Sequence, residues 1–106
     1  IAELIENSEE AMVHAHTPNK IIKVRAELKQ SAGDRSMAQL EVSDTGPGIA
    51  ETNKETIFQP LFTTKEHGTG LGLMTVWDII EQHHGLIAET GFQGRGAQFR
   101  IQLPLV

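Results

Sequence analysis

The sequence contains no cysteine and has few basic residues, nine Lys and Arg against 14 Asp and Glu, which gives a formal net charge of −5. The absence of cysteine excludes a disulfide framework, a thiolate metal site and a cysteine nucleophile. The acidic balance argues against nucleic acid as a partner, because phosphate backbones are bound by basic surfaces. No apolar run approaches the length that spans a membrane, and no signal peptide is present. We therefore expect no nucleic-acid partner and no membrane contact by this chain.

What the chain does contain is typical of one small globular domain. Of its 106 residues, 39% are hydrophobic and 22% are charged, a balance found in folded rather than disordered chains. A chain of this length forms a single domain, residues 1–106. The sequence starts at Ile1 without an initiator methionine and enters a helical pattern at once. We therefore interpret it as an N-terminally truncated part of a longer protein.

Three segments have the pattern of helices. In residues 1–15, apolar side chains recur at intervals of three and four, and Pro18 ends the pattern. A short helix is predicted at about residues 51–58. A longer helix is predicted from Leu71, with Gly85 as its C-terminal stop. The apolar face of the longer helix is predicted to comprise Leu73, Val76, Ile79, Ile80 and His83.

Four segments alternate between apolar and polar residues, as strands with one solvent-facing side do. These segments are residues 22–28, 38–44, 86–90 and 97–103. Strands with one apolar face need a layer of helices on that face. The prediction is an α+β fold, a two-layer α/β sandwich, in which a mostly antiparallel mixed sheet is covered on one face by helices.

Asp44 stands at the end of a predicted strand, on the same face as Leu40 and Val42. A carboxylate on the buried side is costly unless it is hydrogen-bonded. The glycines that follow, Gly46 and Gly48, would let a planar ligand approach the backbone closely. An ionised Asp only accepts hydrogen bonds, so it suits a donor such as the amino group of a base. A plain Asp-X-Gly turn, in which Asp44 caps its own backbone, is the alternative.

Glycines are concentrated before the longer helix, in the stretch GTGLGL (68–73). A glycine loop that leads into a helix N-terminus presents free N–H groups and the positive end of the helix dipole to an anion. In the preceding loop, Thr63, Thr64 and Lys65 offer hydroxyls and a positive charge for phosphate. A flexible hinge, or a loop packed for steric reasons, is the alternative.

Glu3 and Asn7 are four residues apart, so both face the same way on the first predicted helix. The amide oxygen of Asn7 suits a hard cation such as Mg²⁺. The carboxylate of Glu3 could orient or deprotonate a hydroxyl or a water. A polar helix edge without chemistry is the alternative.

In order along the chain, five stretches resemble the sequence boxes of one family. The N box is matched by ELIENSEEA (3–11), the G1 box by DTGPGI (44–49) and the F box by FQPLF (58–62). The G2 box is matched by GTGLGL (68–73), and the G3 position by GRGAQF (94–99). Their order and spacing are similar to the catalytic, ATP-binding domain of sensor histidine kinases (HATPase_c, GHKL superfamily), over nearly the whole chain.

The resemblance implies a Bergerat-type ATP-binding fold, ATP and Mg²⁺ as cofactors, and a mobile lid at about residues 51–69. Asp44 would accept a hydrogen bond from the adenine amino group, and Asn7 would hold Mg²⁺. Glu3 and Asn7 are the implied catalytic residues. The implied nucleotide-binding residues are Asn7, Asp44, Gly46, Gly48, Ile49, Phe58, Phe62, Thr64, Lys65, Gly68, Thr69, Gly70, Leu71, Gly72 and Ala97, of which Phe58 and Phe62 would anchor the lid.

The same resemblance implies a protein-histidine kinase of a two-component phosphorelay. Such a domain binds Mg-ATP and donates the γ-phosphoryl group to a histidine on a separate dimerisation domain of the same protein. A response regulator is then the indirect partner. The implied location is cytoplasmic, also where the domain belongs to a membrane-anchored sensor.

Two positions depart from the pattern of the family. Glu3 stands where histidine kinases most often have Asn. Superfamily ATPases and serine-directed protein kinases use Glu there as a general base, so an ATPase or a serine/threonine-directed kinase is the second hypothesis. Ala97 stands where Thr is frequent, which removes a hydroxyl near the adenine. A degenerate domain that acts as a regulatory module by binding nucleotide or a partner is the third hypothesis.

Overall fold

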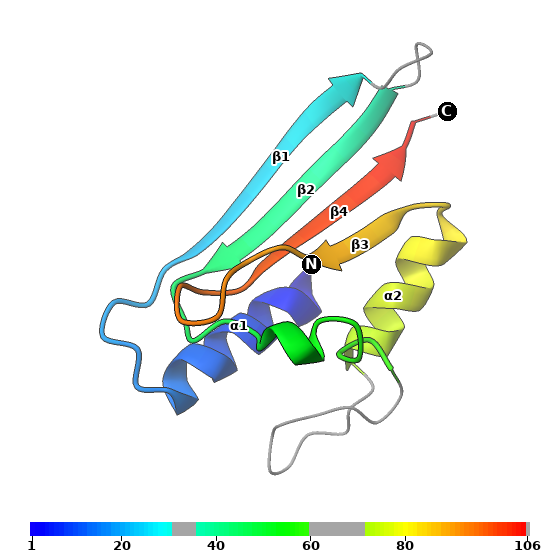
Figure 1. The fold of residues 1–106 in the computed structure, drawn as a ribbon. Helices are drawn as coiled ribbons and strands as arrows, with labels where there is room; N and C mark the ends of the chain where they lie inside the picture. The colour runs from blue at the N-terminus through cyan, green and yellow to red at the C-terminus, as the bar shows by residue number, and fades with distance from the viewer. Residues whose placement is uncertain (31–35, 60–71, 106) are drawn as a thin grey trace.

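The computed structural model describes residues 1–30, 36–59 and 72–105. Helix α1 comes first, and the hairpin of β1 and β2 follows it (Figure 1). Next come a short 3₁₀ helix, helix α2 and the strands β3 and β4. The elements are α1 (Ala2–His14), β1 (Ile22–Gln30), β2 (Ser36–Asp44), η1 (Glu51–Asn53), α2 (Gly72–Gln82), β3 (Leu86–Glu89) and β4 (Gln98–Pro104).

The four strands form one sheet in the order β1-β2-β4-β3, and each pair of neighbours is antiparallel. Val42 of β2 lies opposite Val24 of β1 and Phe99 of β4, so their side chains share one face. Helix α1 packs against β2, and α2 packs against β3. The predicted α+β sandwich, with a mostly antiparallel sheet under helices, is confirmed.

The core lies between the sheet and the helices. Leu4 of α1 and Val42 of β2 are the largest fully buried side chains, and Ile57, from the segment after η1, is buried with them. Burial of apolar area is the main term that holds such a layer in place. The core residues are Leu4, Val42, Ile57, Val76, Ile80, Ile87, Ala97, Phe99 and Ile101.

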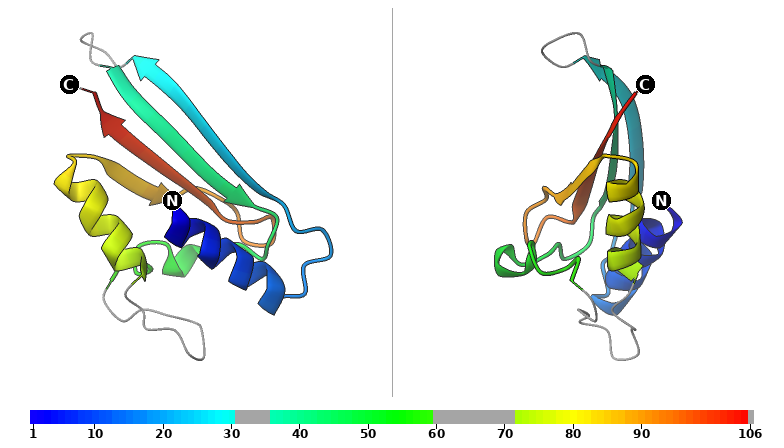
Figure 2. Two further views of the ribbon diagram at one scale, coloured as in Figure 1. Left: turned by 180° about the vertical axis from the view of Figure 1, so that it is seen from behind. Right: turned by 90° about the vertical axis from the view of Figure 1, so that its right-hand side faces the viewer.

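Strand β1 departs from the expectation of a buried apolar face. Val24 is 50% exposed and Leu28 is 77% exposed, although both alternate with charged residues as predicted. The reason is position: β1 is the edge strand of the sheet, and the far ends of β1 and β2 extend beyond both helices (Figures 1 and 2). Alternation identifies the strand, but it does not say that a helix covers it.

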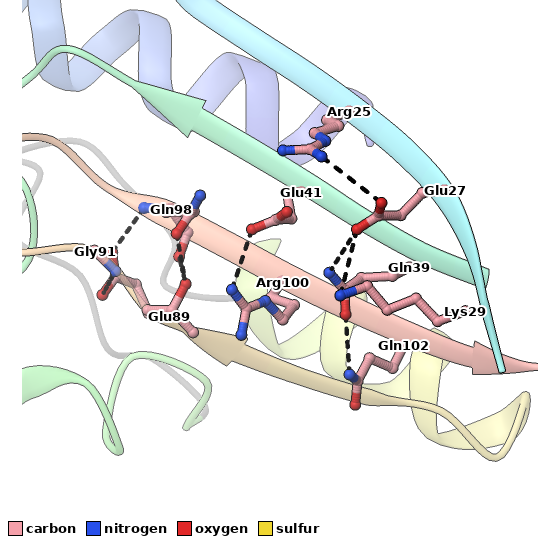
Figure 3. A network of polar contacts seen from close by, with 11 residues as sticks. Arg25, Glu27, Lys29, Gln39, Glu41, Glu89, Gly91, Gln98, Arg100 and Gln102 are labelled. Carbon is pink, nitrogen blue, oxygen red and sulfur yellow. Dashed lines mark hydrogen bonds and ion pairs between the residues drawn. The ribbon is translucent and has the colours of Figure 1, made fainter. Parts of the chain in front are cut away.

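The opposite face of the sheet is polar. Arg100 donates to Glu41 at 3.3 Å, and Gln102 donates to Gln39 at 3.1 Å, across the pair β2 and β4 (Figure 3). Gln39 is only 4% exposed even though none of the described helices packs on this face, because its neighbours on the adjacent strands cover it. Cross-strand pairs of this kind support the sheet that carries the site.

Helix α2 ends one residue earlier than predicted. The left-handed residue is His84, with φ 59°, and not Gly85. The N–H of Gly85 donates to the carbonyl of Ile80 and that of His84 to Glu81, which is a Schellman motif. Gly85 is needed for a different reason, since a Cβ there would stand 2.6 Å from the carbonyl oxygen of Gln102.

The apolar face of α2 is also narrower than predicted. Val76 and Ile80 are buried, whereas Ile79 is 50% exposed and His83 is exposed. Leu73, Val76 and Ile80 contact the core along one stripe of the helix, and Ile79 and His83 lie outside that stripe.

The short helix predicted at 51–58 is wrong in length. Only Glu51–Asn53 is helical, and turns follow it. The N–H groups of Asn53 and Thr56 donate to carbonyls three residues back, which is the tighter 3₁₀ pattern. Ala50 precedes η1 and makes no side-chain cap hydrogen bond, so η1 lacks the N-cap that supports longer helices.

Candidate functional site

Asp44 is the last residue of β2 and is 9% exposed. Its Oδ1 accepts hydrogen bonds from the backbone N–H of Gly46 at 2.9 Å and from that of Ala97 at 3.0 Å. The backbone N–H of Asp44 donates in turn to the carbonyl of Ala97 at 2.9 Å. These bonds explain how a carboxylate is kept on the buried side of a strand.

The second carboxylate oxygen of Asp44, Oδ2, differs from Oδ1 in its hydrogen bonding. Among residues 1–30, 36–59 and 72–105, no donor makes a hydrogen bond to Oδ2. Oδ1 therefore holds the turn, while Oδ2 keeps its acceptor capacity for a ligand donor. The turn role, which the sequence poses as the alternative to a ligand role, uses Oδ1 alone and is therefore compatible with a ligand at Oδ2.

The glycines around Asp44 form a close-fitting cradle. A Cβ on Gly46 would stand 2.9 Å from Cγ of Met12 and 3.2 Å from Oδ1 of Asp44. Gly48 has φ 75°, and a Cβ there would stand 2.8 Å from the carbonyl oxygen of Phe92. Both positions therefore require glycine, one for space and the other for backbone conformation as well.

Gly96 is a site residue that the sequence interpretation did not single out. Its φ is 114°, and a Cβ would overlap the backbone oxygen of Asp44. It lies in the stretch GRGAQF, next to Ala97, which is 9% exposed. The glycine in that stretch was the available signal.

Helix α1 carries Glu3 and Asn7, both partly exposed. The carboxylate of Glu3 lies against the first residue of α2, since a Cβ on Gly72 would stand 2.6 Å from Oε1 of Glu3. One face of α1 thus borders the start of α2, where the glycine stretch ends. The amide oxygen of Asn7 is a hard donor that fits Mg²⁺, which is typically held by few protein oxygens together with water and phosphate.

Two apolar site residues connect the segment after Asp44 to the core. Ile49 is partly buried and packs against the core. The ring of Phe58 lies 5.1 Å from that of Trp77 on α2 and 6.2 Å from that of Phe99 on β4. Phe58 is therefore in contact with both layers of the sandwich.

Part of the predicted site lies outside the described residues. This holds for most of the lid (60–69) and for the glycine stretch except its end. The predicted site residues outside the description are Phe62, Thr64, Lys65, Gly68, Thr69, Gly70 and Leu71.

A buried ion pair beside the cradle was not foreseen. Nζ of Lys54 lies 3.0 Å from Oε1 of Glu89, whose side chain is fully buried, and 3.3 Å from Oε2 of Glu51. The hydrogen bond to Glu89 raises the pKa of Lys54 above its ordinary value of 10.5, burial lowers it, and the charges of Glu89 and Glu51 raise it further. A charge at Glu89, on the inward register of β3 beside Ile87, was the signal in the sequence.

The comparisons with known proteins agree on one family. Residues 1–106 match the family described as histidine kinase-, DNA gyrase B-, and HSP90-like ATPase. The sensor histidine kinase ZraS of Salmonella typhimurium is 48% identical over 83 residues, which cover 78% of this chain and 17% of that protein.

Solved structures give the same result. The nucleotide-free catalytic domain of histidine kinase ThkA is 36% identical, with a TM-score of 0.75, over 96% of this chain and 61% of that one. Full-length ShkA in complex with AMPPNP is 27% identical, also with a TM-score of 0.75, over 96% of this chain and 20% of that one.

The chain therefore belongs to the histidine kinase-, DNA gyrase B- and HSP90-like ATPase family. Within that family it is an ATP-binding catalytic domain of the sensor histidine kinase kind. This favours the histidine kinase hypothesis over the ATPase and serine/threonine-directed kinase that Glu3 suggested. The chain spans about a sixth of the length of its ZraS relative, 17%. In the described part of the chain, no helix combines the length and hydropathy needed to cross a membrane.

Proposed function

We propose that this domain binds Mg-ATP and donates the γ-phosphoryl group to a histidine on a separate dimerisation domain of the same protein. A response regulator is the indirect partner, and the location is cytoplasmic. The single observation that carries the proposal is Asp44, a buried carboxylate with one oxygen held by the backbone and the other free of donors from the described residues.

At the adenine end, Oδ2 of Asp44 would accept a hydrogen bond from the exocyclic amino group. Gly46 and Gly48 let the backbone after Asp44 pack closely against Met12 and Phe92, which fixes the turn that would hold the base. Ala97 offers a methyl group where a hydroxyl would otherwise stand, so the base would be held by Asp44 and by packing.

At the phosphate end, Asn7 would supply a protein ligand to Mg²⁺. When bound, the metal neutralises charge on the phosphate oxygens. The glycine stretch before α2 would present backbone N–H groups to the phosphates, with Gly72 as its end on the described helix. The chain has only nine Lys and Arg, so backbone N–H groups and the metal would neutralise most of the phosphate charge.

The lid at about residues 51–69 would close over the nucleotide. Phe58 supports this part of the proposal, because its contacts with Trp77 and Phe99 attach the start of that segment to the body. Closure would exclude water from the phosphates and leave the phosphoryl group to an incoming histidine.

The test is calorimetric titration of ADP and of a non-hydrolysable ATP analogue, with and without Mg²⁺, on the wild type and Asp44→Asn. The Asn side chain keeps an oxygen for the N–H groups of Gly46 and Ala97, but it replaces Oδ2 with a donor. Loss of the charged hydrogen bond to the base should cost about 1.5–3 kcal/mol, a tenfold to hundredfold weaker Kd.

Asp78→Asn is the matched control, because it replaces an Asp by Asn at an exposed position on α2. Its Kd should equal that of the wild type. Equal affinity for all three proteins would reduce Asp44 to a turn residue. No binding by any of them would favour the regulatory-module hypothesis.

A further inference from the structure

Glu89 is the last residue of β3, and hydrogen bonds and an ion pair hold its carboxylate in place. Its side chain is fully buried, opposite Phe99 in the sheet register. Oε1 accepts from the backbone N–H of Gly91 at 3.1 Å, and Oε2 accepts from that of Gln98 at 2.8 Å (Figure 3). Glu89 thus fixes both ends of the turn at residues 90–97 that connects β3 to β4.

Lys54 reaches this carboxylate from the segment after η1. Nζ of Lys54 lies 3.0 Å from Oε1 of Glu89 and also donates to the carbonyl oxygen of Gly91. Its ammonium group stands 6.0 Å from the ring centroid of Phe92, and its side chain is 16% exposed. One cation therefore links the 51–54 segment to the first residues of the 90–97 turn.

The far end of the same turn holds Asp44. The N–H of Ala97 donates to Oδ1 of Asp44, and the N–H of Asp44 donates to the carbonyl of Ala97. The N–H of Gly94 donates to the carbonyl of Pro47 at 2.7 Å. Hydrogen bonds therefore connect both ends of this turn, one to Glu89 and the other to Asp44.

We propose that Lys54 and Glu89 are positioning residues for nucleotide binding. Glu89 sets the 90–97 turn against Asp44, and Lys54 fastens that turn to the start of the lid. Neither side chain needs to touch the nucleotide for this role. The inference rests on the proposed function, because Asp44 is taken as the group that binds the base.

The test compares Lys54→Met, Lys54→Arg and the wild type by ADP titration and by amide NMR spectra without nucleotide. Lys54→Met leaves Glu89 without its cation, and the Kd for ADP should rise about tenfold. Lys54→Arg restores a cation with several donors, and it should bring the Kd back to within about threefold of the wild type. In Lys54→Met the amide resonances of Gly46 and Ala97, which donate to Asp44 and not to Glu89, should shift.

Lys29→Met is the matched control, since Lys29 also faces a glutamate, Glu27 at 3.5 Å, but it is 51% exposed at the far end of β1. Its Kd and the two amide resonances should stay at wild-type values. If Lys54→Met fails to fold, the milder Lys54→Gln takes its place with a smaller expected rise in Kd.

The outcomes separate the two proposals. Unshifted Gly46 and Ala97 amides together with wild-type affinity in the Lys54 variant would overturn the positioning role. A wild type that binds no ADP would overturn the proposed function. In that case the amide shifts of the nucleotide-free protein still decide whether Lys54 acts on the Asp44 turn.

Discussion

Gly96 offers a stringent test of how the turn and Asp44 fit together, because the chain contains its own control. Gly94 and Gly96 are two residues apart and both have positive φ, 89° and 114°. A Cβ on Gly94 would meet nothing within 4 Å, whereas one on Gly96 would overlap the backbone oxygen of Asp44. The substitutions Gly94→Ala and Gly96→Ala therefore share the conformational penalty and differ in the clash.

The expected difference in stability between the two variants follows from the hydrogen bonds that each substitution disturbs. A positive φ costs an alanine about 1–2 kcal/mol, and both variants carry that cost. Gly96→Ala must also displace the carbonyl of Asp44, which weakens the two hydrogen bonds between Asp44 and Ala97, each contributing about 1 kcal/mol. Gly96→Ala should therefore lower the free energy of unfolding by about 2 kcal/mol more than Gly94→Ala does.

Urea denaturation followed by circular dichroism measures both variants by linear extrapolation. The Kd for ADP should also rise in Gly96→Ala and change little in Gly94→Ala, since only the former moves Asp44. Equal stabilities for the two variants would refute the close approach of Gly96 to Asp44 and, with it, the rigid turn on which the site is built.

Two further predictions concern a helix end and an ion pair. His84→Gly should raise the free energy of unfolding by about 1 kcal/mol, because φ is 59° at His84 and glycine adopts this conformation without strain. His83→Gly should not raise it, because φ is not positive at His83. Urea melts of both variants check this difference. The raised pKa of Lys54, beside Glu89 and Glu51, means that its stabilising contribution is present below pH 10.5 and is lost as pH rises through the folded-state pKa. Unfolding free energies measured across this range should therefore fall more steeply in the wild type than in Lys54→Met, and parallel curves would contradict the assignment.

Local patterns predict the elements well where packing follows periodicity. The strands β2 and β4 and the helix α1 lie where alternation and the three-to-four repeat indicate. The same patterns fail at β1, since a strand at an edge alternates whether or not a helix covers it, and Leu28 is 77% exposed. Coverage depends on distant parts of the chain and has no local signal.

The candidate site also has parts that the sequence predicts and parts that it does not. Asp44 could be found from the sequence because a carboxylate on an apolar face is anomalous, and the glycines after it point to a close approach. The pairing of Lys54 with Glu89 could not, because 35 positions separate them and their contact requires the segment after η1 to fold back onto the end of β3. The difference between the two oxygens of Asp44 also required coordinates, since a sequence does not tell the two atoms of one carboxylate apart.

Two acids are buried among the described residues, Asp44 and Glu89, and their hydrogen bonds are similar except in which oxygens they use. Asp44 and Glu89 each end a strand, and each accepts the N–H of the glycine two residues on, Gly46 or Gly91. Each also accepts an N–H from the β4 end of the turn, Asp44 from Ala97 and Glu89 from Gln98. In Asp44 both bonds go to one oxygen, whereas in Glu89 they occupy both oxygens and Lys54 balances the charge. Glu89 is fully buried, with both oxygens bonded and a cation beside it, so it suits a structural role. Asp44, whose Oδ2 has no donor from the described residues, fits the proposed contact with the adenine.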